Sequence, residues 1–149
     1  MNAFVAAGAG FLLAVLWFDL MFDVQLLGHG TRDPADVAVA SIAAYYARVT
    51  TAARPMNRLV AAAMLGTLAA IVVQIARGER HTWVAWTSLA LVLAAVGLAG
   101  SRTVPRAVRL GERRDEVPRQ VSLARAILRE HVFCFAAIGV VLVLQLAFA

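Results

Sequence analysis

Two aspartates in an otherwise apolar stretch are the residues in this sequence best placed to do chemistry. Asp19 and Asp23 lie four residues apart, so a helix would place both carboxylates on one face. A carboxylate inside a membrane is costly unless it is paired or protonated, and it indicates a functional site by default. His131 begins the last apolar stretch and should lie at the depth of Asp23. We predict Asp19, Asp23 and His131 as catalytic residues, with carboxylates and imidazole acting as acid and base.

Further polar residues should surround this group and bind the anionic part of a ligand. The predicted binding residues are Arg54, Asn57, Arg58, Arg102, Arg129 and Glu130. The alternative is structural, because arginines at the same depth would neutralise the aspartates and clamp the helices together. The arginines concerned are Arg54, Arg58, Arg102 and Arg129. The sequence leaves both interpretations open.

A metal or haem site is a further alternative at the same place. Asp23, His29 and His131 would supply two histidines and one carboxylate, the ligand set of a non-haem iron site. The two histidines alone would suit haem. Because no paired ligand motif such as HxxxH or ExxH occurs, we predict no metal and no cofactor. The single cysteine, Cys134, excludes an internal disulfide and a thiolate zinc site.

The elements that position these residues are membrane spans. The chain of 149 residues is 62% hydrophobic and 15% charged, with a mean hydropathy of +0.77. Crossing the hydrocarbon takes roughly 20 apolar residues in a helix. We predict one all-α domain over residues 1–149, an integral membrane four-helix bundle. Its expected spans are residues 3–27, 59–76, 82–100 and 132–149.

The arginines predict how the bundle is oriented. All 14 basic residues are arginines, and 12 of them lie in the connections after the first and third spans, against two after the second. Cytoplasmic loops carry the excess of positive charge. We therefore expect both long connections in the cytoplasm, in contact with anionic lipid headgroups, and both termini outside. The net charge of +5 follows this topology, so we predict no nucleic-acid partner.

The first connection should contain an additional short helix. Asp33 and Pro34 form a helix-start signal, and residues 37–49 are apolar on most sides. A stretch of about 13 residues is too short to span, so we expect an interfacial helix on the cytoplasmic side. Tyr46 belongs to its apolar stripe. In the second connection Pro105 should break the helix, and residues 121–130 should extend the fourth span.

Span one has a second face that calls for a protein neighbour. Ala6, Gly10 and Ala14 form a row of small residues nearly opposite the aspartates. Small rows let membrane helices approach closely. Because both faces need partners, we predict association with another membrane protein, or self-association, through span one.

The layout resembles small bacterial four-span proteins of the anthrone-oxygenase-like family. The shared features are a long first connection, Asn57 near the start of span two, Val104-Pro105 after span three, and Arg129-Glu130-His131 before span four. The aspartate pair departs from that pattern, as does the absence of a Trp-Asn-His sequence before span four. The resemblance implies oxidation of a lipophilic aromatic substrate in the bacterial cytoplasmic (inner) membrane.

Three functions fit these observations. The first is a small multi-pass protein of the inner membrane that acts as a subunit or assembly partner of a membrane complex. The second is a membrane enzyme, oxygenase-like or acid/base, that uses the carboxylate and histidine site on a lipophilic substrate. The third is a small proton-coupled carrier. The sequence does not decide whether the protein is an enzyme.

Overall fold

The fold is an all-α membrane bundle. The computed structural model describes residues 1–28, 35–52, 54–78 and 81–148, and no strand occurs within these ranges. Four helices are long and apolar enough to cross a membrane: Asn2–Leu27, Pro55–Ala76, Thr82–Glu112 and Val117–Ala147. The predicted fold class, a four-helix membrane bundle with one additional short helix between spans one and two, is confirmed.

The helices follow one another with short connections. Two π-helical segments, η2 and η3, continue α2 and α4 without a break, and a 3₁₀ turn, η1, ends α1. The elements in chain order are α1 (Asn2–Asp23), η1 (Val24–Gly28), α2 (Ala35–Tyr46), η2 (Ala47–Ala52), α3 (Arg54–Ala76), α4 (Thr82–Leu98), η3 (Ala99–Thr103), α5 (Val104–Glu112) and α6 (Val117–Ala147).

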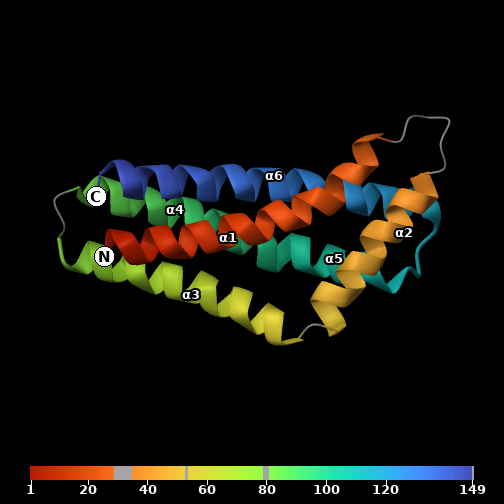
Figure 1. Cartoon of the computed structure of the whole chain (residues 1–149), viewed down its shortest axis with the longest axis horizontal. Helices are drawn as coiled ribbons and strands as arrows, with labels where there is room; N and C mark the ends of the chain where they lie inside the picture. The colour runs from red at the N-terminus through yellow and green to blue at the C-terminus, as the bar shows by residue number, and fades with distance from the viewer. Residues whose placement is uncertain (29–34, 53, 79–80, 149) are drawn as a thin grey trace.

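The four long helices run side by side along the long axis of the molecule (Figure 1). The start of α1, the end of α3, the start of α4 and the end of α6 lie at one end, here called the terminal end. The helix α2 crosses the other end, here called the α2 end. Helix α1 packs chiefly against α6 and then against α3, whereas α3 diverges from α1 toward the α2 end (Figure 1).

The bundle core fills the half toward the terminal end. Its centre consists of fully buried aliphatic residues, among them Val5, Ile71, Val92 and Val141. A buried polar network lies beside it: the side-chain amides of Gln74 and Gln145 bond each other over 3.1 and 3.3 Å. Gln145 also donates to Ser88 over 3.0 Å, and Gln74 donates to Asn2 over 2.7 Å. One network thus links α1, α3, α4 and α6.

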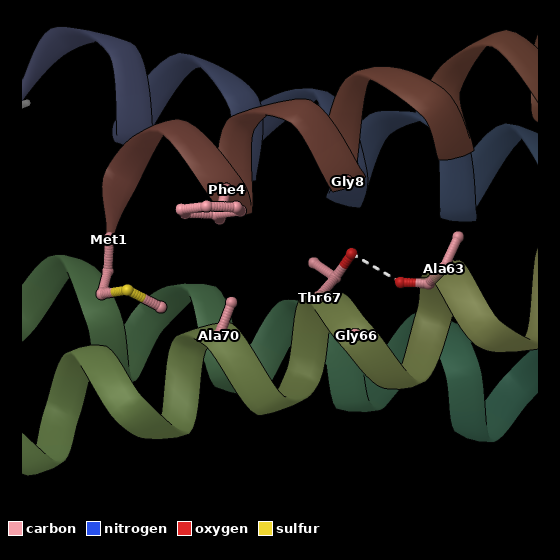
Figure 2. Close-up of a pocket in the computed structure, with 7 residues that line it drawn as sticks. All are labelled: Met1, Phe4, Gly8, Ala63, Gly66, Thr67 and Ala70. Carbon is pink, nitrogen blue, oxygen red and sulfur yellow. Dashed lines mark hydrogen bonds between the residues drawn. The ribbon is translucent and has the colours of Figure 1, made fainter.

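Helices α1 and α3 touch where α1 carries a glycine. Figure 2 shows Gly8 directly facing Thr67, whose hydroxyl donates to the Ala63 carbonyl over 2.7 Å. A Cβ at Gly8 would lie 2.1 Å from the Thr67 hydroxyl oxygen, closer than any real contact. Glycine is therefore what allows this close approach. Beside the contact lies a shallow groove of about 340 Å³, bordered by Phe4 and Gly66.

A second core lies at the α2 end. Ile42 and Tyr46 of α2 pack against Leu110 of α5 and Ile127 of α6. The apolar stripe on residues 37–49 is thus buried beneath the bundle. The predicted start signal of this helix, Asp33 and Pro34, lies outside the described residues.

The helix after span three continues further than predicted. We expected Pro105 to break it, yet the chain stays helical from Thr82 to Glu112. Proline lacks the amide hydrogen that a helix interior needs, and a π-helical segment can absorb such a defect. The segment η3 lies immediately before Pro105, which falls in the first turn of α5. The predicted extension of span four over residues 121–130 is helical, and α6 begins four residues earlier still, at Val117.

Candidate functional site

A buried group of three side chains joins α1, α2 and α6. The Nδ1 atom of His131 lies 2.7 Å from Oδ2 of Asp23, and the Tyr46 hydroxyl donates to Oδ1 of the same carboxylate over 2.7 Å. Because a carboxylate oxygen accepts, Nδ1 is the donor to Asp23. Asp23 is 1% exposed and His131 is 7% exposed. Both oxygens of the Asp23 carboxylate are therefore satisfied inside the protein.

Asp19 completes the cluster one turn earlier on α1. Its Oδ1 atom accepts a hydrogen bond of 2.7 Å from the Tyr45 hydroxyl. Its Oδ2 atom lies 3.9 Å from Nε2 of His131, an ion-pair distance if the imidazole is protonated. The Tyr45 ring stacks on Phe22 with centroids 4.0 Å apart, which holds the phenol toward Asp19. The two carboxylates thus share one imidazole.

The two tyrosines act as neutral hydrogen-bond donors. Burial raises the pKa of Tyr46 well above its usual range, and the negative charge of Asp23 raises that pKa further. Burial and the charge of Asp19 raise the pKa of Tyr45 in the same way. Both phenols therefore keep their protons across the physiological range.

The cluster borders an apolar cavity of about 390 Å³. Asp19, Tyr46 and His131 line the cavity at the α2 end, and Leu12 and Ile138 line it deeper in the bundle. The cavity also reaches Cys134, which is buried and whose thiol lies 3.7 Å from the Ala95 carbonyl oxygen. Pockets of this volume, apolar with a few polar groups, are typical of ligand sites.

Of the predicted binding residues whose side chains are described, one lines the cavity and the others do not. Asn57 lines the cavity and donates to the Thr50 carbonyl over 2.8 Å, which joins the start of α3 to η2. Glu130 points away from the cluster: it forms an ion pair with Arg106 and accepts from Thr103 over 3.0 Å. Arg58, Arg102 and Arg129 lie exposed.

Three of the four arginines named for the clamp do not pair with the aspartates. Within the described part of the chain, no ion pair joins Arg58, Arg102 or Arg129 to either aspartate. The side chain that pairs with Asp23 is instead the imidazole of His131, whose Nδ1 lies 2.7 Å from Oδ2. The side chain of Arg54 and the whole of His29 lie outside the described residues. Across ranges 1–28, 35–52, 54–78 and 81–148, no three histidine, cysteine or acidic side chains are grouped as metal ligands.

Sequence reasoning missed the two tyrosines. Tyr46 was placed in the apolar stripe of the short helix, and Tyr45 was given no role. Adjacent tyrosines at the end of an otherwise alanine-rich helix were the available signal, because buried phenols usually find a polar partner. The topology argument uses Arg106 only as a positive charge, although it pairs with Glu130, the residue before His131.

The arrangement can hold a proton and attract a cation. With both carboxylates ionised and the imidazole protonated, the cluster carries one net negative charge. Asp23 and His131 have their polar groups directed mainly at each other and at Tyr46. Asp19 is the less saturated carboxylate and the one that faces the cavity.

Comparison with known proteins identifies one family. Residues 1–148 match the SHR3 chaperone family, described as ER membrane protein SH3. No curated protein and no solved structure matches the chain.

This match corrects the resemblance drawn from the layout. The resemblance to bacterial anthrone-oxygenase-like proteins is wrong, because the matched family consists of ER membrane chaperones and the match spans nearly the whole chain. The shared features were a four-span topology and a few single residues, which unrelated small membrane proteins also have. The expected location in a bacterial inner membrane is wrong as well, because the matched family is one of ER membrane proteins.

Proposed function

The chain belongs to the SHR3 family of ER membrane chaperones, and on this premise we propose that it assists the assembly of other multi-pass membrane proteins in the ER membrane. The observation that carries the proposal is the extent of the match, which includes all four spans and both long connections. An assembly partner is also what the two faces of span one favour.

The surface of α1 supports this proposal. The aspartate face is turned inward, and the opposite row leaves Trp17 58% and Met21 54% exposed. Nothing lies within 4 Å of the position a Cβ would take at Gly10. Ala14 is exposed as well, and the one ring contact given for Trp17 is with Phe135 of α6, so the row is only partly covered within the described part of this chain. A smooth face with small residues is a surface on which a second transmembrane helix packs well.

The arginines support a defined orientation in the ER membrane. We infer that α2, α5 and the start of α6 lie on the cytosolic side, since they carry the arginine-rich connections. The termini then lie in the lumen. The cavity and its carboxylate cluster open in the cytosolic leaflet.

The test is an assembly assay in a defined bilayer. A multi-span transporter is synthesised in a cell-free system into liposomes that contain either this protein or an unrelated four-span protein. We expect a larger fraction of the transporter to elute as a single dispersed species after mild detergent extraction when this protein is present. Equal aggregation in the two preparations would refute the chaperone proposal.

The same preparation separates a chaperone from a permanent subunit. A chaperone binds the unfolded client and leaves it, whereas a subunit remains bound after folding. We expect this protein to be cross-linked to the transporter during synthesis and to be absent from the purified, folded transporter. Stoichiometric co-purification with the folded protein would favour the subunit.

A further inference from the structure

The cavity has one polar end and a long apolar wall. Leu12 and Leu16 of α1, Val60 and Met64 of α3, and Ile138 of α6 form much of the apolar lining. The polar lining residues Asp19, Asn57 and His131 gather toward the α2 end. An occupant with an apolar stem and one polar head would match this distribution.

Charge complementarity indicates which head group fits. Asp19 receives one hydrogen bond, from Tyr45, and shares His131 with Asp23 at the longer distance of 3.9 Å. A carboxylate has about four acceptor positions, so Asp19 keeps capacity for another donor. The cluster as a whole has one negative charge in excess when both carboxylates are ionised and His131 is protonated. A cation would balance that charge.

One wall of the cavity lies at the surface of the bundle. Its α3 wall is exposed where it lines the cavity: Met56 is 52% exposed, and Asn57 and Ala61 are also exposed. Helix α3 diverges from α1 toward this end (Figure 1). A side chain presented by a neighbouring transmembrane helix can therefore enter from the membrane without passing through the bundle.

We propose that this cavity receives a lysine or arginine side chain from a transmembrane segment of the client protein, with Asp19 as its counter-charge. This proposal rests on the proposed chaperone function and names the class of segment that it recognises. A lysine or arginine combines an apolar stem with a cationic head, as the cavity requires. A cavity of about 390 Å³ holds a side chain and excludes a whole helix.

The physical benefit is mutual. A basic residue within a transmembrane segment and an under-paired carboxylate each cost free energy in the membrane. Pairing them satisfies both groups until the client folds and supplies its own partner. A client segment without a basic residue gains nothing from Asp19.

The experiment measures the association of model transmembrane peptides with the full chain in liposomes. Each peptide has about 22 leucine and alanine residues, a dansyl group, and lysine, glutamate or leucine at the depth of Asp19. Energy transfer from the tryptophans of the chain reports binding. We expect the lysine peptide to bind about tenfold more tightly than the leucine peptide, as one good interhelical polar contact would give.

Two variants assign the effect. Asp19→Asn should reduce binding of the lysine peptide to the level of the leucine peptide. Asp36→Asn is the matched control, since Asp36 is an exposed aspartate on α2 that does not line the cavity. It should leave the lysine preference unchanged. The comparison between peptides on the unaltered chain needs no variant, so a misfolded Asp19→Asn protein would not prevent the test.

The failures of the two proposals differ. Equal binding of lysine and leucine peptides would overturn the Asp19 pairing and leave the chaperone function standing. Preference for the glutamate peptide would also overturn it. Binding of no peptide above the level of an unrelated four-span protein would overturn the pairing and contradict the chaperone proposal as well. Thermal stabilisation by dodecylamine but not by dodecanol, without a lysine preference, would assign the cavity to an amine-headed lipid instead.

Discussion

His131 of α6 lies beside both aspartates of α1: its Nδ1 is 2.7 Å from Asp23 and its Nε2 is 3.9 Å from Asp19. Removing one partner of a buried ion pair leaves the other uncompensated, at a cost of about 3–5 kcal/mol. We expect His131→Ala to lower the free energy of unfolding by about 3 kcal/mol, measured by titration of mixed micelles with SDS. His81→Ala is the control, because the His81 side chain is exposed at the terminal end, where its ring meets Phe148 edge-on. A His131→Ala protein as stable as the His81→Ala protein would show that the pair is dispensable.

The tyrosines of the site give a spectroscopic test at the same scale. Tyr45 and Tyr46 are the only two tyrosines in the sequence, so tyrosinate absorbance reports this cluster alone. Their raised pKa predicts no ionisation near pH 10 while the protein is folded. Above about pH 10 the unfolded chain ionises its phenols and the folded chain does not, so the folded state loses stability as the pH rises. A phenolate step near pH 10 in the folded protein would contradict this, and Tyr45→Phe should halve the final amplitude.

At this scale the sequence predicts the meeting of Asp19, Asp23 and His131 but not their partners. The three residues meet because their spans fix their depth, and depth can be counted along a helix. Tyr45 and Tyr46 reach the site because α2 packs under the bundle, where Ile42 and Leu110 share one core, and this is a tertiary contact between distant segments. No local sequence pattern predicts that contact. The ion pair of Glu130 with Arg106 also joins distant segments, so it was not predictable from the residues beside His131.

The contact between α1 and α3 depends on one glycine at the scale of elements. Gly8→Ala would force a Cβ against the Thr67 hydroxyl, and overpacking of this kind costs about 1–3 kcal/mol. Gly10→Ala on the same helix is the control, since no atom lies within 4 Å of its Cβ position. We expect Gly8→Ala to lower stability in the SDS titration and Gly10→Ala to leave it unchanged or raise it. Adding Thr67→Ala should restore the stability of the Gly8→Ala protein, because it removes the hydroxyl that the new Cβ meets. Equal effects of the two glycine substitutions would show that α1 and α3 do not approach closely at Gly8.

Element existence was predictable here, whereas element continuity was not. Hydropathy and the need to satisfy backbone groups in lipid identify the four helices. The short helix follows from an apolar run too short to span. The third helix continues past Pro105 because a π-helical segment precedes it. No residue of Ala99–Thr103 predicts that segment. A Cβ at Gly111 would lie 2.8 Å from the Ala47 backbone nitrogen, so glycine at this position permits the close approach of α5 to η2.

At the scale of the whole molecule, polar clusters tie the bundle at its two ends. The glutamine network joins all four long helices at the terminal end, and the aspartate–histidine cluster joins α1, α2 and α6 at the α2 end. Helix α3 belongs to the glutamine network at the terminal end. At the other end it is joined to η2 by the bond from Asn57 to the Thr50 carbonyl, and there it diverges from α1 beside the cavity (Figure 1). We expect a client side chain to enter at this divergence.

The orientation of the bundle determines whether that cavity lies in the cytosolic or the lumenal leaflet. The positive-inside rule predicts lumenal termini and cytosolic arginine-rich connections. Neither Asn2 nor Asn57 begins an Asn-x-Ser/Thr acceptor, so the natural chain offers no glycosylation site. We expect acceptor sites added at the C-terminus and after Gly78 to be glycosylated in ER microsomes, and one inserted beside Arg114 to remain unmodified. A glycan only at the site beside Arg114 would show that the bundle has the opposite orientation. The cavity would then receive basic residues from the lumenal halves of client segments.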